Sequence, residues 1–253
     1  MAAAPVVPAP PAPEAAPLSQ GARIINTFIA PSKTFTDLRR SAAWWAPFLL
    51  LVIVSSALVF TAGQKIGFRK IMENQMQSQP KAQARLENLP ADQRERQLDA
   101  GAKFTGIFSY IFPIFLLLIW LFVALVNWAT FRVAVGADIS FGKSLAIIIY
   151  ATLPLTLRSV LSIGSVLAGV NADSFSFQNP LASNPGYFMN PADGVFLYGI
   201  ATAVDIFMIW TLVLTAIGFA CVAKIKTGTA YAVVFGWWAV LTIAVTGVSA
   251  AFS

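Results

Sequence analysis

Five apolar stretches, each long enough to cross a lipid bilayer, restrict what this chain can fold into. They are residues 45–62, 107–131, 145–170, 195–222 and 229–252. About 20 predominantly apolar residues suffice for a membrane-spanning helix. Charged residues make up only 11% of the sequence, against about 25% in soluble domains. We therefore predict an all-α, polytopic integral membrane protein with five transmembrane helices.

A single charged residue interrupts each of two consecutive spans, Arg158 in the third and Asp205 in the fourth. A charge within the hydrocarbon costs roughly 2.5–3.5 kcal/mol on insertion scales. Consecutive spans run in opposite directions, and the rise of a helix places the two residues at similar depth. We predict that they form an ion pair inside the membrane, because pairing offsets most of the cost of either charge. Two roles stay open for this pair: a structural clasp between helices, or the handling of a substrate or proton.

The third span has a further feature around its charge. Pro154, Arg158 and Ser162 recur every four residues on one helical face, and small or polar residues on such a face pack against other helices in membranes. Arg158 should therefore face protein. Because Pro154 lacks a backbone N–H, we expect a helix kink at that residue.

The residues before the first span divide into a tail and a membrane-surface segment. Residues 1–20 are rich in alanine and proline, which predicts a disordered tail. Residues 21–44 contain short amphipathic patterns with a basic side, which predicts an interfacial collar lying on the membrane. The basic side of this collar should contact anionic lipid headgroups. Its expected interfacial anchors are Phe28, Pro31, Phe35, Arg39, Arg40, Trp44 and Trp45.

The distribution of lysine and arginine sets the expected orientation. Basic residues occur before the first span and in the links after the second and fourth spans, whereas residues 171–194 contain none. The positive-inside rule therefore predicts a cytoplasmic N-terminus and a C-terminus outside. Residues 63–106 differ, with eight basic and five acidic residues. We expect this segment, divided by Pro80 and Pro90, to be helical and extramembrane, either as a solvated hairpin or as a partner-binding cap.

The sequence offers little catalytic equipment. It has no histidine and one cysteine, Cys221, which excludes histidine-dependent triads, histidine metal sites and an internal disulfide. There is no phosphate-binding glycine loop and no dense basic cluster with interleaved aromatic residues. We therefore expect no enzymatic activity, no cofactor, no metal site and no nucleic-acid partner.

Several short motifs resemble those of a known family. The stretch IINTFIAPSKTF at 24–35, followed by WAP at 45–47, resembles the start of bacterial members of the Ypt-interacting-protein (Yip) family. FGKSL at 141–145 and YATLP at 150–154 are similar to a second recurrent block of that family. The short basic link at 224–228 fits the family as well.

The resemblance covers most of the chain and implies five membrane helices, a cytosolic N-terminus and no catalytic residues. Eukaryotic relatives are associated with small GTPases and membrane traffic. The tail and the charged segment 63–106 look like the bacterial branch, so we expect the bacterial inner membrane. The expected domains are the tail (1–20), the collar (21–44) and a five-helix membrane domain (45–252).

We expect a non-catalytic scaffold or membrane-organising, trafficking-type factor that acts through protein or lipid partners. The alternative is a small permease or transporter subunit whose pathway includes Arg158 and Asp205. The sequence leaves the oligomeric state open.

Overall fold

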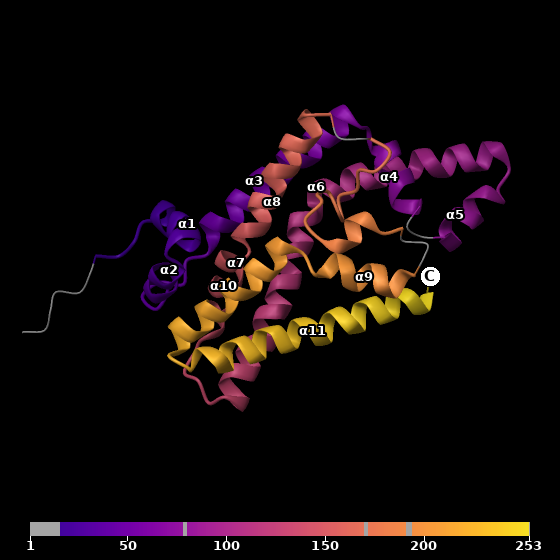
Figure 1. Ribbon diagram of the computed structural model, residues 1–253. Helices are drawn as coiled ribbons and strands as arrows, with labels where there is room; N and C mark the ends of the chain where they lie inside the picture. The colour runs from indigo at the N-terminus through magenta and orange to yellow at the C-terminus, as the bar shows by residue number, and fades with distance from the viewer. Residues whose placement is uncertain (1–15, 78–79, 170–171, 191–193, 253) are drawn as a thin grey trace, which may run out of the picture.

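The computed structural model describes residues 16–77, 80–169, 172–190 and 194–252, and its regular elements are all helices. Within these ranges, five helical segments are long and apolar enough to cross a membrane (Figure 1). They are α3 (Trp45–Lys65), α6 with its π-helical end (Ala91–Ala134), α7 with α8 (Phe141–Leu167), α10 (Ile206–Ala223) and α11 (Thr227–Phe252). The all-α class and the number of spans are thereby confirmed.

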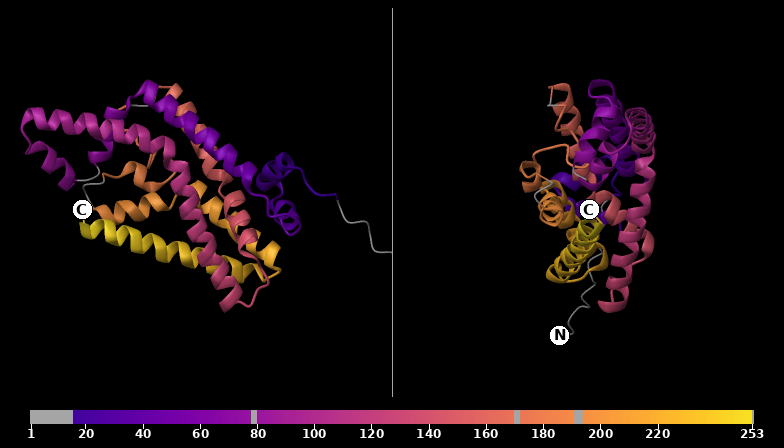
Figure 2. Two further views of the ribbon diagram at one scale, coloured as in Figure 1. Left: turned by 180° about the vertical axis from the view of Figure 1, so that it is seen from behind. Right: turned by 90° about the vertical axis from the view of Figure 1, so that its right-hand side faces the viewer.

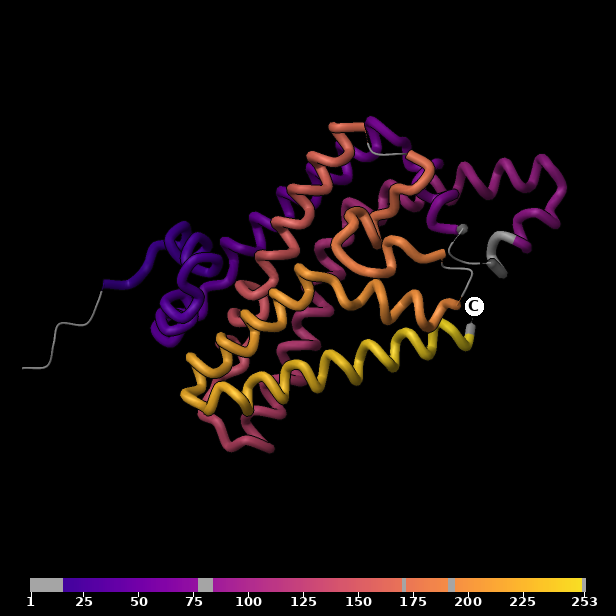
Figure 3. The backbone as a smooth tube through the Cα atoms, in the orientation of Figure 1, coloured from indigo at the N-terminus to yellow at the C-terminus, as the bar shows by residue number. Residues whose placement is uncertain are grey.

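The spans pack as a bundle around one large apolar core. α3 lies along α8, α6 lies along α7, and α10 contacts α7, α8 and α11 (Figures 1 and 3). Stacking of Phe131 on Phe219, with ring centroids 4.3 Å apart, joins the π-helical end of α6 to α10. Large apolar side chains on the outer faces of α6 and α11 are exposed, for example Phe122 and Val240. Such faces suit contact with lipid tails, which are as apolar as the side chains.

The predicted collar forms two short helices at one end of the molecule, α1 (Gln20–Ile29) and α2 (Pro31–Asp37) (Figure 1). The Ser19 hydroxyl caps α1 by accepting from the Ala22 N–H. The predicted tail lies mostly outside the described residues, and its last residue already belongs to α1. α2 packs against α10, so the collar is joined to the bundle.

The predicted extramembrane helices lie at the opposite end (Figure 2). α4 (Phe68–Gln77) is followed by α5 (Pro80–Glu87), and α6 starts directly after Pro90, so both prolines mark helix starts. The last of these helices does not end before the membrane. Instead, α6 runs without interruption for 39 residues, with Pro113 inside it.

Ion pairs tie α4 to its surroundings. The Arg69 guanidinium lies 2.8 Å from Glu95 and 3.2 Å from both Glu73 and Asp99. The Lys70 ammonium lies 2.5 Å from the Asp173 carboxylate. This hydrogen bond raises the pKa of Lys70 above its ordinary value, because the carboxylate favours the charged form. These contacts hold α4 against α6 and against the loop that follows α8.

Two of the spans are interrupted helices. α7 ends at Ala151 and α8 begins at Leu153, where Pro154 is expected to disturb the helix. The fourth apolar stretch is not the continuous span that its hydropathy predicts: α9 (Val195–Ala203) stops, and α10 begins after Asp205. The chain passes from α9 to α10 near the middle of the molecule (Figure 3).

Candidate functional site

The helix break at Asp205 organises a buried polar cluster. The backbone of Asp205 is extended, with φ −97° and ψ 138°. Its carboxylate caps α10 by accepting from the N–H groups of Phe207, at 2.9 Å, and Met208, at 3.2 Å. Aspartate is among the preferred N-cap residues because it satisfies these otherwise unpaired donors. The side chain of Asp205 is only 3% exposed.

The loop after α8 folds back onto this carboxylate. The Ser183 hydroxyl donates to Asp205, and the Asn184 amide donates to it at 3.4 Å. The backbone continues the contact, since the Ile206 N–H donates to the Ser183 carbonyl at 3.0 Å. Asn179 and Asn184 also bond to each other, with Nδ2 of Asn184 donating at 2.8 Å.

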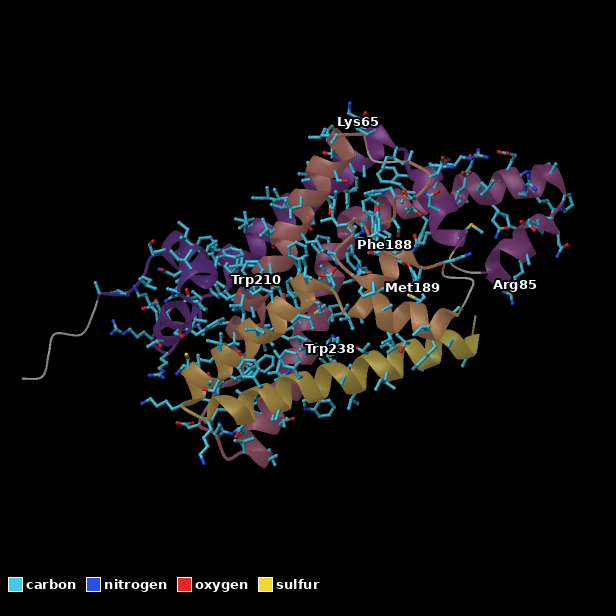
Figure 4. The ribbon with its side chains drawn as sticks, in the orientation of Figure 1. Lys65, Arg85, Phe188, Met189, Trp210 and Trp238 are labelled. Carbon is cyan, nitrogen blue, oxygen red and sulfur yellow. The ribbon has the colours of Figure 1, made fainter. Side chains whose placement is uncertain are left out.

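The loop therefore enters the bundle and is not confined to its surface. Ser183, Asn184 and Asn179 are all buried. A short 3-10 helix, Pro185–Phe188, packs against α9. The approach is close: a Cβ on Gly186 would lie 2.8 Å from the backbone nitrogen of Thr202. Phe188 ends this helix and Met189 follows it, close to α9 (Figure 4).

The structure brings Arg158 and Asp205 together, but loosely. Nη1 of Arg158 lies 3.7 Å from Oδ2 of Asp205, which is beyond hydrogen-bond distance. The Arg158 side chain is 26% exposed, so it faces protein only in part. Contact between α8 and α10 brings the two residues within ion-pair distance. The pair is therefore asymmetric, with a fully bonded carboxylate and a weakly engaged guanidinium.

A second buried ion pair, which the sequence analysis missed, lies within the collar. Nε of Arg23 donates to Asp37 at 2.7 Å, and the two side chains are 3% and 8% exposed. Asp37 also accepts from the Leu18 N–H at 3.3 Å. The hydroxyls of Thr27 and Thr34 both donate to the Arg23 carbonyl at 2.8 Å. Arg23 lies on α1 and Asp37 on α2, and the turn between the two helices brings them together. Helical spacing along the sequence therefore could not predict this pair.

The prediction that Phe35 anchors the collar at the lipid surface is wrong. It is fully buried, and its ring would lie 3.0 Å from a Cβ placed on Gly218 of α10. Phe35 therefore contacts protein and does not face a lipid surface. The amphipathic pattern placed Phe35 on the apolar face of a short helix, but this face packs against α10 and not against lipid.

Of the remaining anchors, some contact the helical bundle and others are exposed on the surface. The ring of Phe28 meets that of Trp210 on α10 edge-on, with centroids 5.6 Å apart, and Trp210 lies on the collar side of α10 (Figure 4). Arg39 Nε donates to the Cys221 carbonyl at 2.8 Å. The half-buried residues among the anchors are Phe28, Pro31, Arg39 and Trp44, and the exposed ones are Arg40 and Trp45.

Tyr150 connects the third span to the collar. Its side chain is fully buried, and its hydroxyl donates to Oε1 of Gln20 at 2.6 Å. Gln20 is the first residue of α1. A single tyrosine at the end of α7 thus holds the start of the collar against the bundle. In the described residues, no group of three or more potential metal ligands is present.

These features define a polytopic membrane protein with an interrupted fourth span, a loop that enters the bundle and an N-terminal collar fixed to it. The Yip1 domain model matches residues 25–248. The chain belongs to the Yip1 domain family. No curated protein and no solved structure matches the chain.

The motifs that carry the family resemblance converge on the collar junction. In the first motif, Pro31 starts α2, Thr34 bonds to Arg23 and Phe35 fills the contact with α10. In the second block, the Ser144 hydroxyl donates to the Ala124 carbonyl at 2.8 Å, which joins α7 to α6. Tyr150 of the same block binds the start of α1. Of these residues, Thr34, Phe35 and Tyr150 therefore position the collar, and Ser144 joins two helices of the bundle.

Proposed function

We propose that this protein is a non-catalytic membrane organiser that gathers anionic lipids, and with them partner proteins, at its collar. The observation that carries the proposal is the buried Arg23–Asp37 pair, because it fixes α1 and α2 as a preformed surface. A preformed surface binds without the entropic cost of ordering a flexible segment. This rigid presentation supports a scaffold role for the protein.

The exposed residues of the collar suit a membrane surface. Ile25 and Ile29 are 60% and 74% exposed on one face of α1, and Trp45 is 56% exposed at the start of α3. Apolar side chains of this kind insert among headgroups. The exposed ammonium of Lys33 lies on the neighbouring helix. Apolar insertion and electrostatic attraction would therefore act together.

Basic residues gather at the same end as the collar. Arg39 contacts the end of α10, directly before the link that contains Lys224 and Lys226. Arg132 lies in the π-helical end of α6, beside Phe131, which stacks on Phe219 of α10. By the positive-inside rule this end faces the cytoplasm. We further propose the bacterial inner membrane, whose cytoplasmic leaflet would supply the anionic lipids.

Two matched double variants test this function. We expect Lys33→Gln with Lys226→Gln to lower the enrichment of phosphatidylglycerol around the full-length protein about thirtyfold, since each surface lysine contributes about 1 kcal/mol. The control is Lys65→Gln with Lys103→Gln, two exposed lysines at the opposite end. The measurement is the composition of lipids retained by protein purified from nanodiscs of phosphatidylglycerol and phosphatidylcholine. Equal loss in both variants would refute a role specific to the collar.

A second function, a permease or transporter subunit, is favoured by the interrupted fourth span. Broken helices with a loop inside the bundle are how many transporters build a site within the membrane. If a pathway exists, cysteines placed at Thr156 and Thr211 should react with water-soluble reagents. Both hydroxyls are buried and have no hydrogen-bond partner among the described residues. The measurement is labelling in a Cys221→Ser background, and complete protection would exclude an aqueous pathway there.

A further inference from the structure

The loop between α8 and α9 links the extramembrane helices to the polar cluster inside the bundle. Its described residues, 172–190, form a strap whose regular structure is limited to one short 3-10 helix. The strap is attached near its start to α4 and further along to the cap of α10. These two attachments are built differently.

The attachment to α10 is made of several hydrogen bonds. Ser183 and Asn184 donate to the Asp205 carboxylate, and the Ile206 N–H donates to the Ser183 carbonyl at 3.0 Å. Asn179 supports this arrangement through its bonds with Asn184. With the strap in place, the carboxylate is covered by protein.

The attachment to α4 depends mainly on one side-chain amide. Nδ2 of Asn74 donates to the carbonyls of Ala172, at 2.7 Å, and Phe175, at 2.9 Å, so both of its N–H groups are used. The Lys70 ammonium pairs with the Asp173 carboxylate beside it. This ion pair is at the surface, where such pairs contribute little to stability.

The same attachment contains an unpaired acceptor. Oδ1 of Asn74 is buried and has no hydrogen-bond partner among the described residues. An unpaired buried acceptor costs free energy, which offsets part of what the two donated bonds contribute. Phe175 also packs in a small apolar cluster with Ile71 of α4, so α4 contacts the start of the strap by packing as well. The attachment is therefore specific in geometry but modest in net free energy.

We propose that α4 is a latch for the strap: when α4 releases Ala172 and Phe175, the strap withdraws and water reaches the Asp205 cluster. Segments without regular secondary structure open locally at lower free energy than packed helices. An event at α4, in the aqueous phase, would thereby change access to a polar cluster inside the bundle. α4 lies at the end opposite the collar (Figure 1), and the latch does not rest on the function proposed for the collar.

The experiment follows amide hydrogen exchange of the full-length protein in phosphatidylcholine nanodiscs by mass spectrometry. The reporting group is the Ile206 N–H, which loses its bond to Ser183 when the strap withdraws. The test variant is Asn74→Leu, and the matched control is Asn88→Leu, which changes an exposed asparagine directly after α5. Peptides from α7, which contacts the collar through Tyr150, report opening of the bundle as a whole.

We expect Asn74→Leu to accelerate exchange at Ile206 about tenfold, because the two hydrogen bonds of the latch are lost. Exchange in α7 should stay as in the wild type, and Asn88→Leu should leave both regions unchanged. Exchange at Ile206 that is as slow in Asn74→Leu as in Asn88→Leu would overturn the proposal.

A charge reversal decides the matter if Asn74→Leu also accelerates exchange in α7. Lys70→Asp places a like charge opposite Asp173, and Lys70→Asp with Asp173→Lys restores an ion pair. Faster exchange at Ile206 in the single variant, with recovery in the double variant, supports the latch. Equal rates at Ile206 in the single and the double variant would show that α4 does not control the strap.

Discussion

Replacing Asp205 by leucine is expected to destabilise the bundle by about 3–5 kcal/mol, the usual cost of removing one partner of a buried ion pair. The substitution removes the cap of α10 and the shared acceptor of Ser183 and Asn184, so that the Asn184 amide keeps only its bond to Asn179. It also leaves Arg158 without its counter-charge. The measurement is the free energy of unfolding in detergent micelles, followed by circular dichroism.

Asp205→Asn is the informative comparison. Asparagine caps helices about as well as aspartate, so this variant should keep the cap of α10. It loses the charge and replaces the oxygen that accepts from Ser183 and Asn184 by an amide donor, so its stability should lie between those of Asp205→Leu and the wild type. Ile206→Leu changes a neighbouring residue that is 64% exposed and serves as the control. If Asp205→Leu unfolds at the same free energy as Ile206→Leu, the polar cluster does not support the fold.

An exchange of the two charges is not expected to restore the protein. Arginine at position 205 cannot accept hydrogen bonds, so α10 would lose its cap whatever residue stands at position 158. The loop residues Ser183 and Asn184 would also face donors in place of an acceptor. The failure of such an exchange would therefore reflect the cap and would not indicate a transport role.

Replacing Arg23 by methionine is expected to cost about 3–5 kcal/mol and to release the collar, because Asp37 would remain charged and buried. Arg23 also donates to the Ser41 carbonyl at 3.2 Å, which would lose its partner. Limited proteolysis of the folded protein should then cut between the collar and α3. Unfolding in micelles measures the loss of stability.

The double variant Arg23→Met with Asp37→Leu separates charge from packing. Replacing both partners of a buried pair by apolar residues is often neutral, so the double variant should recover much of the lost stability. Arg96→Met is the control, since its ion pair with Asp92 is exposed and such pairs contribute little. A collar as resistant to protease in Arg23→Met as in the wild type would show that the pair does not hold it.

The pairing of Arg158 and Asp205 was predicted from their opposite charges and their similar depth on consecutive spans. In the structure the two side chains lie within ion-pair distance. Charge and depth could not predict the unequal roles of the two side chains. A sequence signal for the cap did exist, because aspartate directly before an apolar run is a typical helix start. The continuous hydropathy of 195–222 outweighed that signal.

The collar shows the opposite case. Its amphipathic pattern indicated short helices with Phe35 on an apolar face, and that face was predicted to meet lipid, whereas Phe35 is buried in protein. What that face meets depends on Gly218, which leaves room for the ring. No local pattern connects two residues so far apart in the sequence. The same holds for Tyr150 and Gln20.

The amino-acid sequence by itself determined an all-α membrane protein with five spans, because apolar stretches of this length satisfy their backbone groups in a bilayer only as helices. Only the tertiary structure decided that the fourth span is broken, that Asp205 caps α10 and that the collar joins the core. A broken helix is tolerated where distant side chains satisfy the freed backbone groups. At Asp205 the helix cap depends on its own carboxylate, and the loop residues Ser183 and Asn184 complete the polar cluster.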